Sequence, residues 1–291
     1  MASGSSSAVL ALIGAALLWS FANVYMKGPL MAYEMLPLLT GRYVTAFILM
    51  YLILRQTNHK VKSHEMMPGI IIGALTFIGF LLNGVGLILS TPARASFLSS
   101  LSVLFVPVFS YFLALKVRDR EITAAMIAFT GLILFTFTPD WQISTGEIAL
   151  FLDNIPFALG LVLTGIYLRK CDFKSLMLVG FGTTALLSLL FSISNQQFDF
   201  QPTVIAIGIV SGIFFTMIPT GLQSWALIRV SPTATEVIIS LCPVFTGMLS
   251  NYFLGETFSF AQVVGGVLIV YGSIYAAPGK ADKEIGVATG H

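Results

Sequence analysis

Ten apolar stretches of about 20 residues follow one another through the chain, separated by short connections. Because a helix needs about 20 mostly apolar residues to cross a bilayer, each stretch is a candidate transmembrane helix. Only 10% of the residues are charged, whereas a typical soluble protein has about 25%. The sequence therefore predicts an all-α integral membrane protein with ten transmembrane helices. The stretches cover residues 8–26, 33–54, 67–88, 92–115, 121–138, 145–168, 174–193, 202–228, 233–254 and 259–276.

The Lys and Arg residues are distributed unevenly over the connections between these stretches. If the N-terminus is cytoplasmic, every second connection and the C-terminal region are cytoplasmic too, and these segments contain 12 of the 15 basic residues. Cytoplasmic loops carry an excess of Lys and Arg. We therefore expect both termini in the cytoplasm and a multi-pass protein of the cell (inner) membrane. The basic residues are Arg55, Lys60, Lys62, Lys116, Arg118, Arg120, Arg169, Lys170, Lys174, Arg229, Lys280 and Lys283.

The second half of the chain repeats the first. TPARASFLSSLSVLF at 91–105 aligns with SPTATEVIISLCPVF at 231–245, so that Ser100 aligns with Ser240. We call the difference in residue number between aligned positions, 231 − 91 = 140, the repeat shift. Each copy holds five predicted helices, which is an odd number, so the second copy must cross the membrane the other way up. The basic connection after the second stretch aligns with residues 194–200, which contain no Lys or Arg. Opposite loop charge is what an inverted pair requires.

This pattern predicts two inverted five-helix repeats at 1–140 and 141–278, followed by a disordered tail at 279–291. Repeats of inverted topology, related by a pseudo-twofold axis in the membrane plane, are typical of secondary transporters. The sequence therefore favours a transporter in which two similar halves enclose a hydrated cavity.

Four stretches resemble one known family. LLWSFANVYMK, GRYVTAF, TPARASFLSSLSVLFVPVF and SPTATEVIISLCPVFTGMLSNYFLGE are similar to signatures of the ten-helix, EamA-like branch of the drug/metabolite transporter superfamily. Ser20 stands where that family usually has Gly, and Lys116 stands where the second repeat has Glu256. The resemblance implies helices one, three, four, six, eight and nine around a central cavity. It also implies peripheral second and seventh helices, with the fifth and tenth at a dimer or packing face.

Two ionisable residues, Asp153 and Arg42, lie at similar depth within predicted spans. A charge at the centre of a membrane helix costs at least ~2.5–3.5 kcal/mol, so each requires an explanation. In one interpretation Asp153, beside Asn154, faces the cavity as a proton or cation site. In the other, Asp153 and Arg42 form a structural ion pair that joins two helices.

Other polar and aromatic side chains recur at equivalent or neighbouring positions. Asn83 and Gln223 are related by the repeat shift, and Trp19 and Asn23 share one side of a helix at spacing i, i+4. Such side chains can bind a polar solute or can join helices by hydrogen bonds. The predicted cavity lining is Trp19, Asn23, Asn83, Ser99, Ser100, Asp153, Asn154, Gln223, Trp225 and Ser240.

Two charged residues lie near predicted helix starts at the mouths of the cavity. Arg94 is a candidate gate or mouth residue that could attract anions. Glu236 is a second gate candidate, although a carboxylate near a helix N-terminus is also favourable as a cap.

The remaining patterns narrow the function. No His or Cys stands beside a carboxylate within a predicted span, and no metal-ligand spacing occurs, so we predict no enzyme, cofactor or metal site. No basic run suggests nucleic acid.

The leading hypothesis is a secondary active transporter, most simply an exporter, that moves a small polar or amphipathic metabolite or drug by alternating access. Two alternatives stay open for coupling, namely a proton and a counter-substrate. Two also stay open for the oligomeric state, namely a monomer and a homodimer. The alternative is a channel or a lipid scramblase-like protein without a carrier cycle.

Overall fold

The computed structural model describes residues 3–136, 144–198, 201–254 and 259–277 of the chain. The tail predicted at 279–291 lies outside these residues. In the described part all regular secondary structure is helical. The elements are α1 (Ser3–Ala32), α2 (Met35–Gln56), α3 (Ser63–Leu89), α4 (Pro92–Ser99), α5 (Ser102–Phe112), α6 (Asp119–Thr136), α7 (Thr145–Tyr167), α8 (Phe173–Ser194), α9 (Pro202–Gly212), the π-helix η1 (Ile213–Met217), α10 (Ile218–Leu227), α11 (Pro232–Ile239), α12 (Cys242–Leu254) and α13 (Phe260–Ala276).

Most of these helices have the length and composition of membrane spans. Eight helical segments of the described chain are long and apolar enough to cross a membrane. The shorter α13 is apolar, and α6 is an 18-residue helix with Asp119 and Glu121 in its first turn. The chain is therefore an all-helical membrane protein, whereas the count of ten spans stays a prediction.

Two of the predicted spans are each interrupted at the same position of the repeat. The span at 92–115 is divided into α4 and α5 at Ser100, and the span at 233–254 is divided into α11 and α12 at Ser240. Ser100 Oγ donates to Ser96 O at 2.8 Å, and Ser240 Oγ donates to Val237 O at 2.6 Å. Such side-chain bonds to the preceding turn compete with the helix ladder and bend helices. The bond accompanies both interruptions, but Ser188 makes the same bond within the uninterrupted α8.

The span predicted at 202–228 is also irregular, because η1 separates α9 from α10. Pro219 lies just beyond η1 and has no N–H group, so it cannot donate to the carbonyl of Phe215 four residues earlier. The π-helical turn therefore contains a carbonyl that another group can bind.

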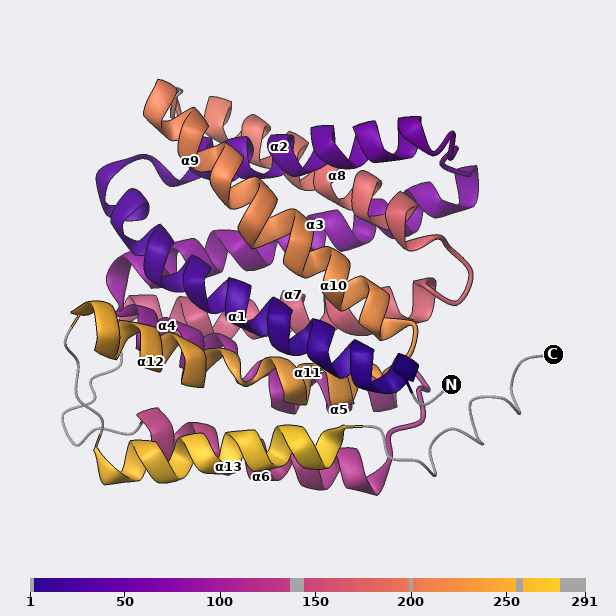
Figure 1. Cartoon of the computed structure of the whole chain (residues 1–291). Helices are drawn as coiled ribbons and strands as arrows, with labels where there is room; N and C mark the ends of the chain where they lie inside the picture. The colour runs from indigo at the N-terminus through magenta and orange to yellow at the C-terminus, as the bar shows by residue number, and fades with distance from the viewer. Residues whose placement is uncertain (1–2, 137–143, 199–200, 255–258, 278–291) are drawn as a thin grey trace.

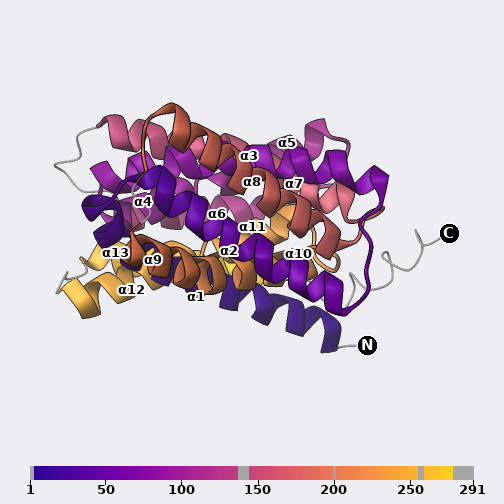
Figure 2. The same ribbon diagram turned by 90° about the horizontal axis from the view of Figure 1, so that it is seen from above.

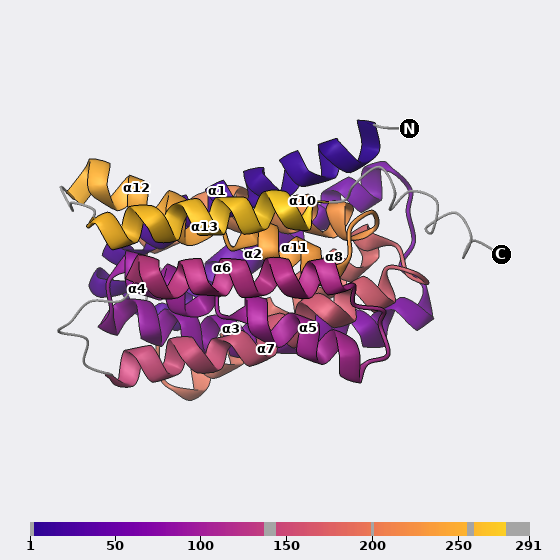
Figure 3. The same ribbon diagram turned by 90° about the horizontal axis from the view of Figure 1, so that it is seen from below.

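The bundle has two outer faces and a core between them. On one face α6 packs along α13, where Gly131 and Gly265 bring the two backbones into contact (Figures 1 and 3). On the opposite face α2 packs against α8 and α9 (Figures 1 and 2). The core contains α1, α3, α4, α5, α7, α10, α11 and α12. In it, α3 contacts α7 and α1 contacts α10.

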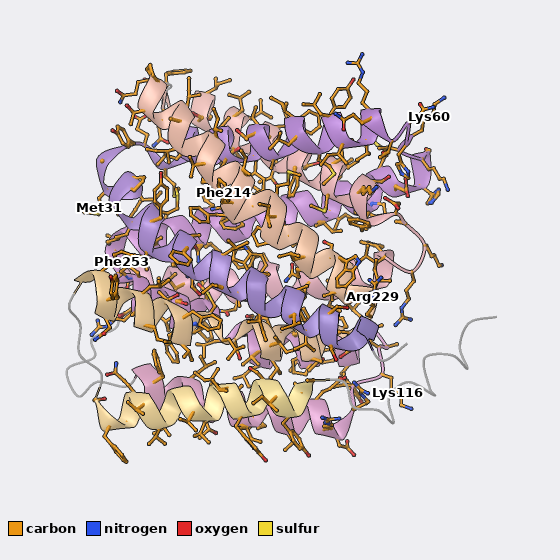
Figure 4. All side chains as sticks on the ribbon, in the orientation of Figure 1. Met31, Lys60, Lys116, Phe214, Arg229 and Phe253 are labelled. Atoms are coloured by element: carbon orange, nitrogen blue, oxygen red, sulfur yellow. The ribbon has the colours of Figure 1, made fainter. Side chains whose placement is uncertain are left out.

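The direction of the helices follows from the same views. α1 begins at the end of the bundle at which α13 ends, and α1 and α7 run in opposite directions (Figures 1 and 3). Lys60, Lys116 and Arg229 lie at the end where α1 begins, and Met31 and Phe253 lie at the other end (Figure 4).

Candidate functional site

A cavity of about 280 Å³ lies inside the bundle. Its wall extends from Leu30 and Met35, at the junction of α1 and α2, to Leu168 and Leu176, at the junction of α7 and α8. Most of the wall is aliphatic or aromatic, with a limited number of hydroxyl, amide and charged groups. This composition is typical of small-molecule sites, in which a few polar groups orient an otherwise apolar contact.

A buried hydrogen-bond cluster lies along one wall of the cavity. Asn83 and Ser99 line the cavity, whereas Asp153 lies directly behind them and is fully buried. Asp153 Oδ2 accepts from Ser99 Oγ at 2.7 Å and from Asn83 Nδ2 at 2.9 Å. Asp153 Oδ1 has no hydrogen-bond partner in the described part of the chain. α3, α4 and α7 are thus joined through one carboxyl group that still has an unused acceptor.

A second carboxyl group faces the other side of the same helix interruption. Glu236 of α11 lines the cavity, is 8% exposed, and accepts a hydrogen bond from Ser102 Oγ at the start of α5. Ser102 Oγ also lies 3.1 Å from Ser99 O. Because a hydroxyl has one proton, Ser102 can donate to only one of these acceptors at a time.

The geometry changes the prediction for Glu236. The N-cap of α11 is Ser231, whose side chain accepts from Ala234 N, so Glu236 is not a helix cap. It lies one turn inside the helix and contacts the cavity. The serines on either side of the α4–α5 interruption therefore bind the two buried carboxyl groups.

Arg42 lines the cavity and has partners other than Asp153. Its Nη2 donates to Phe215 O at 2.7 Å, and its Nε donates to Thr216 Oγ1. Its guanidinium carbon lies 4.6 Å from the centre of the Phe80 ring, a distance at which a cation and a ring attract each other. The ion pair between Arg42 and Asp153 that one interpretation predicted is therefore wrong. Phe215 O, which receives no helix bond from Pro219 because proline has no N–H group, is thus the acceptor for Arg42.

Four further predicted lining residues face the cavity. Trp19, Asn23, Ser100 and Gln223 belong to its wall. Asn23 Nδ2 lies 3.8 Å from the thiol of Cys242, which is also in the wall. No motif in the sequence points to Cys242 as a cavity residue.

Four predicted lining residues do not reach the cavity, and Asp153 is the first of them, because it lies behind Asn83 and Ser99. Asn154 is fully buried and its Nδ2 lies 2.9 Å from the carbonyl oxygens of Leu98 and Leu150, so it joins α7 to α4. Ser240 donates within its own helix. Trp225 lies beneath the guanidinium of Arg229, 4.0 Å from ring centre to guanidinium carbon. Asn154 therefore connects two helices through its amide nitrogen, although its Oδ1 has no partner in the described part of the chain, and the ring of Trp225 supports Arg229.

At the end of the cavity near Leu30, charged side chains join neighbouring helices to one another. Lys27 Nζ donates to the carbonyls of Leu87, Ile88 and Ser90 at 2.8 Å each, so α1 caps the C-terminus of α3. Arg94 pairs with the carboxylate of Glu147 at 3.4 Å, which joins α4 to α7.

The contribution of α2 and α8 differs from the expectation of peripheral helices. Arg42 and Tyr43 of α2, and Phe181 and Thr184 of α8, belong to the cavity wall. α6 and α13 contribute no lining residue within the described ranges. The wall therefore involves all of the described helices except the pair on one outer face and α9, whose continuation η1 supplies Thr216.

Comparisons with known proteins found one family, one transporter and one similar fold. The sequence model of the EamA-like transporter family matches residues 6–137 and again residues 144–277. An uncharacterized transporter of Archaeoglobus fulgidus is 26% identical over 212 residues, which span 72% of this chain and 68% of the relative. A solved crystal structure, described only as that of a protein, has the same fold, with a TM-score of 0.74 and 18% identity over 96% of this chain and 99% of its own.

Proposed function

This chain belongs to the EamA-like transporter family, and we propose that it is a secondary active transporter that works by alternating access. The chain is a membrane transporter. Its proposed activity is the export of a small polar or amphipathic metabolite or drug across the inner membrane. The observation that carries this proposal is a cavity inside the bundle with two buried carboxyl groups bound through neighbouring serines of an interrupted helix.

We further propose that residues 1–140 and 141–278 form two inverted five-helix repeats, with both termini in the cytoplasm. A pseudo-twofold axis requires helix contacts to occur in equivalent pairs under the repeat shift. The contact of α3 with α7 has its counterpart in α10 with α1, and that of α4 with α7 in α11 with α1. The contact of α4 with α12 corresponds to that of α11 with α5. The opposite directions of α1 and α7 also support an inverted pair.

Asp153 and Glu236 are the proposed coupling sites. Both are buried, and none of the ion pairs in the described part of the chain includes either carboxyl group. An isolated charge in an apolar environment is costly unless it is neutralised or paired. A proton that binds in one conformation and leaves in the other would remove and restore this cost once per cycle. We therefore propose that a proton, or a cationic group of the solute, exchanges at these carboxyl groups.

Alternating access also requires contacts that one end of the bundle can form and release. The bonds from Lys27 to the last carbonyls of α3 and the pair of Arg94 with Glu147 join four core helices at one end. These polar contacts can break when water enters, so we propose that they close the outer end.

Counterflow tests this proposal against the alternative of a channel or scramblase. A thermal-shift screen of amines, amino acids and nucleosides on the purified chain would identify a bound solute. We expect liposomes loaded with that unlabelled solute to accumulate the labelled form transiently, because a carrier exchanges one molecule for another across the membrane. Protein-free liposomes are the control. Labelled uptake that is independent of the internal solute and does not saturate would contradict the carrier mechanism.

A further inference from the structure

A second pocket, of about 360 Å³, lies at the end of the bundle where α1 begins. It is formed by Lys116 beyond α5, by Arg169 beyond α7, and by residues 227–232 between α10 and α11. Leu168 belongs to the wall of this pocket and also to the wall of the central cavity. Lys116 and Arg229 lie at the same end of the bundle (Figure 4). The basic pocket, as we call it, is thus a separate recess beside the cavity.

The charges of the basic pocket have one sign. Three of its wall residues, Lys116, Arg169 and Arg229, are basic, and none of the described wall residues is acidic. The buried carboxylate of Glu121 lies nearby, but it accepts from Arg118 Nη2 at 2.6 Å and from Ser231 Oγ at 2.7 Å. Glu121 is therefore already neutralised by Arg118. None of the three pocket cations takes part in the ion pairs of the described chain.

Most of the other wall residues are apolar, and one of the three cations is held in place by its neighbours. Leu115, Leu168, Leu227 and Val230 belong to the wall. Arg229 stacks on Trp225 and donates from Nη1 to Trp225 O at 2.8 Å, which fixes the guanidinium at the rim. A basic rim over an apolar wall fits an anion that also has an apolar part.

Comparison of the two repeats explains why this recess exists. Under the repeat shift, the carbonyls that bind Lys27 correspond to those of Leu227, Ile228 and Val230, and Lys27 corresponds to Tyr167. The second repeat therefore has no ammonium group at the position that Lys27 occupies in the first. Leu227, Ile228 and Val230 instead belong to the wall of the basic pocket, whose rim has three cations.

We propose that the basic pocket binds a phosphate-bearing anion, such as the head group of an anionic phospholipid. Basic pockets between helices at the cytoplasmic surface bind anionic head groups, and each Lys or Arg near the surface contributes roughly equally to the attraction. Guanidinium groups match phosphate oxygens with two parallel donors. The proposal goes beyond solute transport, because binding at this pocket would occur without a transport cycle.

Thermal stability of the full chain in a neutral detergent tests the proposal with three additives at constant ionic strength. These are phosphatidylglycerol, phosphatidylcholine and inorganic phosphate. The test variant replaces Lys116, Arg169 and Arg229 by Gln. The control variant replaces Arg55, Lys60 and Lys62 by Gln, which removes the same number of cations from the last turn of α2 and the connection that follows it.

We expect phosphatidylglycerol to raise the melting temperature of the wild type and the control variant equally, and phosphatidylcholine to leave it unchanged. In the test variant the apparent affinity should be roughly 100-fold lower, which is the effect of three surface charges. A second variant, Lys116→Gln with Arg169→Gln, retains the stacked Arg229. It should bind roughly 30-fold more weakly than the wild type, and it keeps the test valid if the triple variant does not fold.

The additives distinguish the source of the anion. The same variant-dependent shift with inorganic phosphate would support the pocket and assign it to soluble phosphate compounds as well. An equal shift in the test and control variants, with either additive, would overturn the proposal, because it would show only a general effect of net charge. Absence of any shift in the wild type would overturn it too.

Discussion

Asp153→Asn is expected to abolish proton-coupled transport and to leave the protein folded. The two side chains have nearly the same shape, and the Asn oxygen can still accept from Ser99 Oγ and Asn83 Nδ2, which bind Asp153 Oδ2 at 2.7 and 2.9 Å. An amide cannot take up and release a proton near neutral pH. We therefore expect uptake driven by a pH gradient in liposomes to fall to the level of protein-free liposomes, with an unchanged melting temperature in detergent.

The matched control is Asp172→Asn, which makes the same chemical change outside the cavity. Asp172 is the N-cap of α8 and accepts from Lys174 N at 2.9 Å, a role that Asn fills equally well. This variant should transport like the wild type. If Asp153→Asn also transports uphill at the normal rate, the carboxyl group of Asp153 has a purely structural role and the proposed coupling site is wrong.

Gly265→Ala is expected to destabilise the protein by about 1–3 kcal/mol, the usual range for overpacking. A methyl group at this position would lie 2.5 Å from Gly131 O and 2.5 Å from Phe135 N on the facing helix. These are backbone atoms, so they cannot rotate away, and α6 and α13 would have to separate. We expect a lower melting temperature and more aggregation on heating in detergent.

The neighbouring residue supplies the control for this second variant. A methyl group at Gly266 would lie 3.7 Å from the Phe135 ring, which is ordinary contact distance. Ala also has a higher helix propensity than Gly, by roughly 1 kcal/mol in water. Gly266→Ala should therefore be neutral or slightly stabilising. Equal melting temperatures for the two variants would show that the close packing of α6 on α13 does not contribute to stability.

The helices and the repeat could be predicted from sequence because both follow from local patterns. Long apolar stretches specify membrane helices, since the bilayer core satisfies no backbone hydrogen bond. The repeat shift can be read directly from the amino-acid sequence. The interruptions at Ser100 and Ser240 were not predicted, because a serine bound to the preceding turn also occurs within a continuous helix, as Ser188 does in α8.

The partners of the buried charged groups could not be predicted in the same way. Asp153 and Arg42 lie at similar depth within their predicted membrane spans. Depth along a helix does not determine which way a side chain points. The bundle turns Asp153 toward Asn83 and Ser99, 70 and 54 residues earlier, and these contacts depend on how three helices pack. One signal was available for Arg42. The missing N–H of Pro219 identifies the carbonyl of Phe215 as an acceptor that needs another donor.

Access of water to Cys242 shows whether the bundle encloses a hydrated cavity, because its thiol belongs to the cavity wall and the chain has only one other cysteine, Cys171. The Cys171→Ser variant would be labelled in vesicles with a membrane-impermeant thiol reagent added on either side. Cys242→Ser, which retains Cys171 in the connection between α7 and α8, reports which side is exposed. We expect that Cys242 reacts from the aqueous phase, that bound solute slows the reaction, and that a pH gradient changes the side from which it occurs. A thiol that stays unreactive from both sides in every condition, and reacts fully only after unfolding, would mean a dry centre and would rule out transport through this cavity.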